Sequence, residues 1–149
     1  MSMNDKINID NLSFKLTYFY KIAWRRYFCN LYTELCNYEK LGSVKELKNM
    51  LSTSDAESVR LEYNKNMTAY DKSVKAHYYP ELKKNGKLLL DTIKSASDTF
   101  NDEEIKYVKK MIKKFDKYTK LGTVAEIKYI IENIKNKEMS EIEDNIANK

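Results

Sequence analysis

The sequence predicts an all-α protein, and three observations support this prediction. The chain of 149 residues contains only three glycines and one proline, which leaves little turn material for a many-stranded sandwich or barrel. Apolar residues recur every three or four positions through most of the chain, which is the spacing of amphipathic helices. No segment alternates apolar and polar residues as a half-buried strand does. We therefore expect a bundle of helices.

A repeated turn is the most informative feature of the chain. Residues 38–48, with the sequence YEKLGSVKELK, return 80 residues later as residues 118–128, YTKLGTVAEIK. Gly42 and Gly122 stand where a helix commonly ends in a left-handed residue. The Ser or Thr after each glycine can cap the next helix, and a Glu three residues later completes a capping box. Each copy is therefore expected to form an αα-hairpin.

The same capping rules divide the rest of the chain. Capping boxes are expected at Ser54 with Glu57 and at Asn101 with Glu104, and Pro80 is expected to separate two helices. The predicted helices cover residues 11–41, 44–52, 55–78, 81–99, 102–121 and 124–137. The length favours a single domain over residues 1–149, with frayed tails at 1–10 and 138–149.

The first predicted helix is apolar nearly all round, unlike the others. Its broad face carries Leu12, Leu16, Phe19, Tyr20, Ala23, Trp24, Tyr27, Phe28, Leu31 and Leu35, and its reverse face carries Phe14, Tyr18, Ile22, Cys29, Tyr32 and Cys36. A helix of this kind is usually buried on both sides. It is either the central helix of the domain or a helix with one face in the core and the other on a partner, which could be a second copy of the chain.

The residues needed for most catalytic and metal sites are missing. His77 is the only histidine, and Cys29 and Cys36 lie about two helical turns apart, too far for a mutual disulfide. These three residues supply too few ligands for a zinc site, and no Gly-rich phosphate loop or nucleophile elbow is present. We therefore expect no enzymatic activity, no metal and no cofactor.

Two groups of residues are candidates for binding. The first is a lysine stripe on the helix 102–121, which falls within a sector of about 140° opposite the apolar side. Its members are Lys106, Lys109, Lys110, Lys113, Lys114, Lys117 and Lys120, and Asp116 is the only acidic residue among them. Such a stripe can be a solvated helix face, or it can bind nucleic-acid phosphates without sequence preference.

The second group is rich in Tyr, Trp and Arg, the residue types that most often anchor protein interfaces. It comprises Tyr18, Trp24, Arg25, Arg26 and Tyr32. The alternative interpretation places these side chains at the edge of the core. The total of twelve tyrosines favours some exposure, because each buried hydroxyl needs a hydrogen-bond partner.

The formal charge of +5 is mildly basic, and the abundance of Lys, Asn, Ile and Tyr is typical of an AT-rich genome, so part of this charge can reflect codon usage. No apolar run approaches the length of a membrane span, and the first residues lack the pattern of a secretory signal. The sequence therefore predicts a cytoplasmic protein.

The segment 117–128 resembles a turn of small helical proteins from phages and mobile elements of low-GC Gram-positive bacteria. This resemblance implies an origin of that kind, and such proteins include accessory factors and anti-CRISPR inhibitors. No functional residue is transferred from it. The leading hypothesis is a non-enzymatic protein that binds a host or phage protein, such as a defence nuclease, stoichiometrically. The alternatives are a nucleic-acid-binding protein that uses the lysine stripe and a structural homodimer that uses the reverse face of the first helix.

Overall fold

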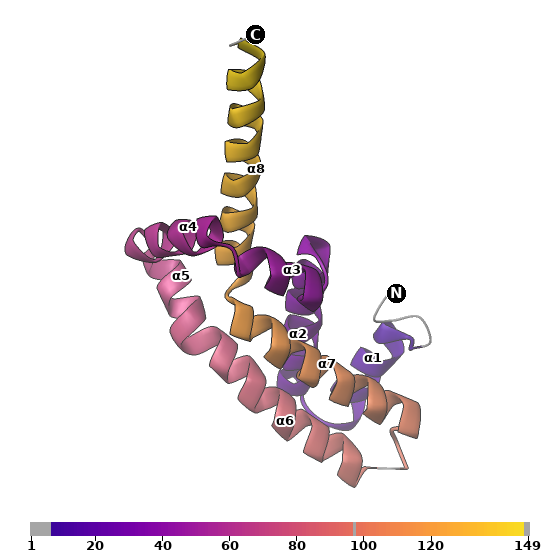
Figure 1. Ribbon diagram of the computed structural model, residues 1–149. Helices are drawn as coiled ribbons and strands as arrows, with labels where there is room; N and C mark the ends of the chain where they lie inside the picture. Colours follow the sequence, from indigo (N-terminus) through magenta and orange to yellow (C-terminus); the bar gives the residue numbers. More distant parts are fainter. Residues whose placement is uncertain (1–6, 97, 148–149) are drawn as a thin grey trace.

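The computed structural model describes residues 7–96 and 98–147 (Figure 1). These residues are helical for the most part and contain no strand, which confirms the predicted all-α class. The helices are α1 (Ile9–Phe19), α2 (Ile22–Leu41), α3 (Val44–Leu51), α4 (Ser54–Lys65), α5 (Ala69–Ser73), the π-helix η1 (Val74–Tyr78), α6 (Tyr79–Ser95), α7 (Asp102–Leu121) and α8 (Val124–Ala147). Because α5, η1 and α6 are continuous, the described residues form seven helical segments rather than the predicted six.

The two repeated turns are αα-hairpins, as predicted. Gly42 ends α2 and Gly122 ends α7, with φ angles of 144° and 139°. Their ψ angles lie near 180°, so both adopt the extended region at positive φ rather than the expected left-handed helical one. That region is open essentially only to glycine. The glycine that the two copies share thus reflects a backbone conformation that needs glycine at both places.

The two hairpins face each other through a reciprocal pair of tyrosines. The Tyr38 hydroxyl donates to the Gly122 carbonyl at 2.7 Å, and the Tyr118 hydroxyl donates to the Gly42 carbonyl at 3.1 Å. The two rings stack with their centroids 4.9 Å apart. Each copy of the repeat therefore donates a hydrogen bond to the turn of the other copy.

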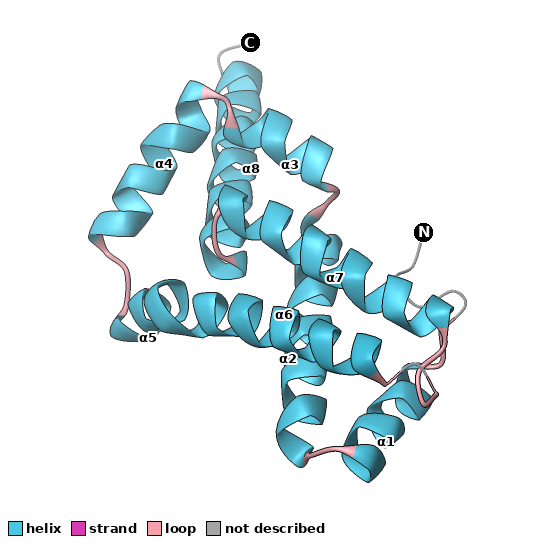
Figure 2. Cartoon of the chain, turned by 90° about the horizontal axis from the view of Figure 1, so that it is seen from below, coloured by secondary structure: helices cyan, strands magenta, loops and turns pink. Residues whose placement is uncertain are grey.

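The first predicted helix is wrong as a single element, because it breaks at Tyr20 and Lys21. Lys21 is extended, with φ −140° and ψ 151°, and α1 folds back along α2 so that the Ser13 hydroxyl lies 3.7 Å from the Cys29 sulfur (Figure 2). Leu12 and Leu16 of α1 enter the same core as the apolar face of α2. The all-round apolar pattern therefore comes from two shorter helices that pack together.

Two further boundaries differ from the prediction. The helix expected over 55–78 ends at Lys65, and Thr68 caps a new helix by accepting a hydrogen bond from the Asp71 amide. The helical path then runs unbroken through Pro80, which stands in the first turn of α6 directly after η1. Proline lacks an amide proton and is tolerated in a first turn, so it marks the change from π to α geometry instead of a break.

The capping predictions are partly right. Asn101 and Glu104 form the expected capping box at the start of α7. The cap of α4 is Thr53, which accepts from the Ala56 amide, so the box predicted at Ser54 is wrong by one residue. The predicted tail 138–149 is helical as far as Ala147, whereas residues 1–6 and 148–149 lie outside the described residues.

The core lies where α2, α6 and α7 pack against one another, with α1 and α3 at its sides. Its largest fully buried side chains include Phe28, Tyr38, Phe100 and Phe115. Gly86 of α6 allows a close approach to α7, since a Cβ atom there would lie 3.3 Å from Ile112.

Alkaline pH should unfold this core. Burial raises the pKa of Tyr38, Tyr79 and Tyr107 above the ordinary value near 10, and burial followed by the Asp71 side chain raises the pKa of Tyr63 to about 12. Because the folded pKa values are the higher ones, the stability that these neutral phenols contribute is complete below about pH 10 and is lost as the pH rises further. We expect the ionisation of the buried tyrosines and the loss of helical circular dichroism to occur together above pH 10. Ionisation of all the tyrosines with an unchanged helical signal would contradict this.

Candidate functional site

The lysine stripe occupies the outer face of α7, as the sequence predicts. The opposite side of this helix is buried in the core through residues such as Val108, Met111 and Phe115. Six of the seven lysines are exposed, and Lys114 is half-buried. We call the seven residues the lysine face: Lys106, Lys109, Lys110, Lys113, Lys114, Lys117 and Lys120.

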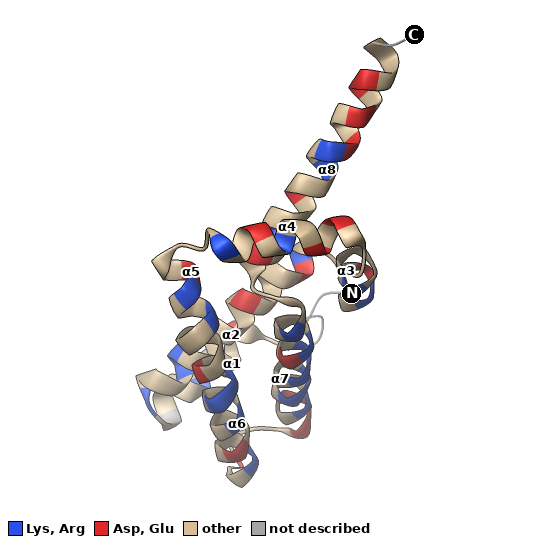
Figure 3. Cartoon of the chain, turned by 60° about the vertical axis from the view of Figure 1, so that its left-hand side comes forward, with Lys and Arg blue, Asp and Glu red and all other residues tan. Residues whose placement is uncertain are grey.

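The lysine face holds the whole net positive charge of the protein. Residues 106–120 carry seven lysines and one aspartate, which gives a formal charge of +6. The full chain has a charge of +5, so all other residues together sum to −1. Figure 3 shows a series of basic residues along α7, besides those on other helices. Codon usage alone would spread lysines evenly along the chain, whereas residues 106–120 hold seven lysines and a single acidic residue.

Asp116 ties the lysine face to the neighbouring helix α6. Its carboxylate oxygens lie 3.4 Å from the Lys120 ammonium group and 3.4 Å from that of Lys83. Burial alone raises the pKa of Asp116, but hydrogen bonds and charges from Lys120 and Lys83 outweigh it and hold the pKa below its usual value. Lys83 thus extends the basic surface onto α6. No sequence pattern reveals this residue, because its position depends on how α6 packs against α7.

The members of the aromatic–arginine group differ in their exposure. Tyr18 is exposed on α1, and Arg25 is exposed on α2. Trp24 and Tyr32 are half-buried and pack against the core, where Tyr32 stacks on Phe28 with ring centroids 6.5 Å apart. These two residues fit the alternative interpretation, in which they lie at the edge of the core.

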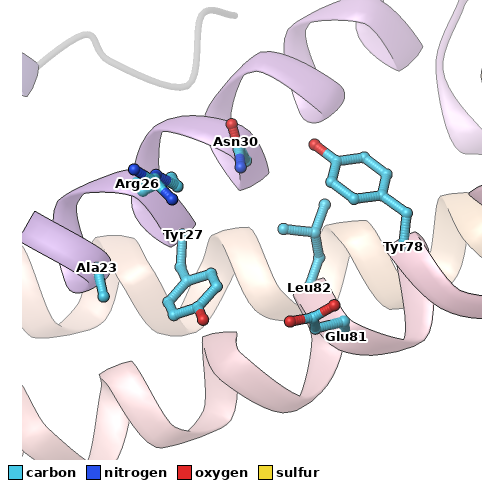
Figure 4. A pocket seen from close by; sticks show the side chains of 7 residues that line it. All are labelled: Ala23, Arg26, Tyr27, Asn30, Tyr78, Glu81 and Leu82. Carbon is cyan, nitrogen blue, oxygen red and sulfur yellow. The ribbon is translucent and has the colours of Figure 1, made fainter.

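The fifth member, Arg26, lies in a groove between α2 and the segment η1–α6. Figure 4 shows Arg26, Tyr27 and Asn30 of α2 facing Tyr78 and Glu81 across a cavity of about 240 Å³. Ala23 and Leu82 complete the lining. The sequence singled out Arg26 as an interface residue, but Asn30 and Glu81 were missed because their meeting depends on the packing of two distant helices.

A second cavity of about 280 Å³ continues the groove along α2. It shares Tyr78 with the first and is lined further along by Glu34, Asn37 and the start of α8. At its floor the Tyr79 hydroxyl donates to a Glu34 carboxylate oxygen at 2.7 Å. We call the two cavities together the α2 groove. Tyrosine, arginine and amide side chains in one groove are typical of a surface that holds a peptide or a protein loop.

The residues with catalytic or metal-binding chemistry lie apart from one another. His77 is exposed on η1. Both cysteines are half-buried and form no disulfide. Within 7–96 and 98–147, no three His, Cys, Asp or Glu side chains are grouped as metal ligands. In the same residues, no helix combines the length and the hydropathy that a membrane crossing requires.

Comparisons with known proteins do not assign the chain to a group. No protein-family model matches it, and no curated protein or solved structure is significantly similar to it.

Proposed function

We propose that this chain is a non-enzymatic nucleic-acid-binding protein that acts in the cytoplasm and contacts phosphates through the lysine face of α7. The observation that supports the proposal is the concentration of charge: one helix face carries +6, and the remaining residues sum to −1. A fixed row of cations on a rigid helix releases the counterions of a nucleic-acid backbone when it binds, and this release supplies the affinity.

The chemistry of the lysine face indicates which part of the nucleic acid it contacts. From Lys106 to Lys120 the row is about 21 Å long at 1.5 Å per residue. Lysine is a point charge without the planar fork with which arginine reads guanine. The face also carries no aromatic side chain on which an unpaired base could stack. Binding should therefore be directed at the backbone and be independent of sequence.

A salt series tests this proposal. We expect binding of the wild-type protein to a short DNA duplex, measured by fluorescence anisotropy, to weaken linearly on a plot of log K against log salt concentration. Contacts to about five phosphates predict a slope of about −4.5. Duplexes of unrelated sequence should give the same curve. Absence of binding at low salt, or a slope near zero, would contradict the proposal.

Replacing Asp116 with Asn should strengthen binding. The change removes the one carboxylate within the lysine face and releases Lys83 and Lys120 to contact phosphates. We expect affinity to rise roughly 2- to 5-fold at low salt, with a slope steeper by about 1. The same anisotropy titration measures both quantities. Weaker binding would show instead that Asp116 is needed to hold the two lysines in place.

The α2 groove favours a second candidate function, which is stoichiometric binding of a protein partner. Such a partner could be a nuclease with which a host cell defends itself against phages. Arginine and tyrosine are frequent anchors of protein interfaces, and the groove presents Arg26, Tyr27 and Tyr78 together. Its polar and acidic lining differs from the lysine face, so the two candidates make separate predictions. An anti-CRISPR-like inhibitor would act through this groove.

A cleavage assay distinguishes the two candidates. Purified RNA-guided nuclease would be titrated with the wild-type protein, with Arg26→Glu/Tyr78→Ala, or with Lys109→Glu/Lys113→Glu/Lys117→Glu. Inhibition that saturates at one equivalent and is lost only in the groove variant supports the second candidate. Inhibition lost only in the lysine variant indicates competition for the nucleic acid. No inhibition by the wild-type protein would count against the anti-CRISPR role.

A further inference from the structure

The outer half of α8 projects away from the rest of the molecule (Figure 1). Ile127 and Ile130 anchor the first turns of this helix in the protein, but every side chain from residue 135 to residue 147 is exposed. A helical stretch of about a dozen residues is only marginally stable in water by itself. This half of the helix therefore lacks the packing that normally stabilises a helix of its length.

The projecting half of α8 carries an apolar stripe. Met139, Ile142 and Ile146 are 61%, 58% and 68% exposed, and their spacing of three and four residues places them on one side of the helix. Residues 138–147 contain four acidic side chains and no basic one. We call residues 138–147 the acidic arm. The apolar stripe can pack on an apolar surface, and the acidic side chains beside it favour a surface that is surrounded by positive charge.

Such a surface is present at the bend between α1 and α2. Phe14, Tyr18 and Ile22 are 62%, 70% and 66% exposed, and the first two rings stack with centroids 5.7 Å apart. We call these three residues the corner patch. Residues 11–33 around it contain four basic side chains and no acidic one; Lys15 is paired with Glu104 at 2.9 Å, whereas Lys21 and Arg25 are exposed. The corner patch thus complements the acidic arm in both hydrophobicity and charge.

The acidic arm cannot reach the corner patch of its own chain, because α8 points away from α1 (Figure 1). Together the two surfaces hold six of the nine large hydrophobic side chains that are exposed among the described residues. We propose that the acidic arm of one molecule docks on the corner patch of a second copy, and that the exchange is reciprocal. The corner patch lies on the reverse face of the first predicted helix, but its occupant is the arm of α8 and not another corner patch.

The exchange uses surfaces other than the lysine face. The dimer would therefore leave α7 of each copy available, so that two lysine faces are carried by one particle. Because acidic and basic groups meet across the contact, association should weaken as salt increases.

Sedimentation velocity over a concentration series tests the proposal. We expect the wild-type protein to form dimers, and Ile142→Glu/Ile146→Glu in the arm to weaken dimerisation by at least about 100-fold. Phe14→Glu/Ile22→Glu in the corner patch should have a similar effect. The control, Leu61→Glu/Leu88→Glu, changes two other exposed apolar residues and should leave dimerisation intact. Circular dichroism verifies folding, and the arm variant alone suffices if the corner variant unfolds.

Mixing the two defective proteins gives the sharpest result. A pair of one arm variant and one corner variant retains a single intact contact, so the mixture should form a heterodimer although neither variant dimerises alone. A wild-type protein that stays monomeric, or an arm variant that still dimerises, would overturn the proposal. Loss of dimers in Lys109→Glu/Lys113→Glu/Lys117→Glu would also overturn it, since the arm would then dock on α7.

Discussion

Reversing three charges on α7 should abolish nucleic-acid binding while leaving the protein folded. Lys109, Lys113 and Lys117 are exposed along one row of the helix, and none of them forms an ion pair with another residue of 7–96 or 98–147. Changing all three to Glu removes about three phosphate contacts and places three anions at the same positions. We expect affinity for a DNA duplex to fall by at least about 100-fold at low salt and the salt slope to decrease by about 3.

A matched control variant distinguishes the effect of where the charges lie from the effect of the net charge of the protein. Lys65, Lys72 and Lys84 are exposed on α4, α5 and α6, away from the lysine face. Changing these three to Glu lowers the formal charge from +5 to −1, as the α7 variant does. The control should retain most of its affinity, because the proposal places the phosphate contacts on the lysine face and Lys83. Equal losses in both variants would mean that binding depends on overall charge and on no particular surface.

Replacing Arg60 with Met should cost about 3 kcal/mol of unfolding free energy, which is a large part of the stability of a small protein. The Arg60 guanidinium pairs with the Glu126 carboxylate at 3.0 Å and donates to the Leu121 carbonyl at 2.6 Å. The Glu126 side chain is only 1% exposed, so the substitution leaves a buried carboxylate with Lys75 at 3.4 Å as its remaining ion pair. Thermal unfolding should shift down by roughly 6–12 °C.

Two comparisons verify the cause of this loss. Lys137 pairs with Asp55 at 2.8 Å and also links α8 to α4, but both side chains are more than half exposed. Lys137→Met should therefore leave the melting temperature unchanged within error. Replacing Glu126 with Met together with Arg60→Met should recover part of the lost stability, because no buried charge remains. If Lys137→Met were as destabilising as Arg60→Met, burial would not be the reason.

The sequence was sufficient to predict those parts of the structure that local signals determine. The bounds of α7 were predicted to the residue, because Asn101 caps its start and Gly122 ends it. For the same reason the lysine face could be identified from the spacing of its residues alone. The sequence does not predict the break before Thr68, although Thr68 and Asp71 form a recognisable cap, because the apolar spacing of a helix continues across it.

Other features depend on contacts that no local pattern contains. The bend at Tyr20 and Lys21 has neither glycine, proline nor a side-chain cap, and it exists because Leu12 and Leu16 can then join the core. The α2 groove and the position of Lys83 likewise require the packing of α6. Consequently the lysine face could be predicted from the sequence, whereas the groove that Arg26 lines could not.

The most direct measurement maps binding onto the chain. Amide chemical shifts of the wild-type protein would be recorded during titration with a short DNA duplex at low salt. The account predicts that the largest changes fall on residues 106–120 and on Lys83, and that they disappear as salt is added. Shifts centred on Arg26 and Tyr78, or no shifts at all, would contradict a nucleic-acid-binding role for α7.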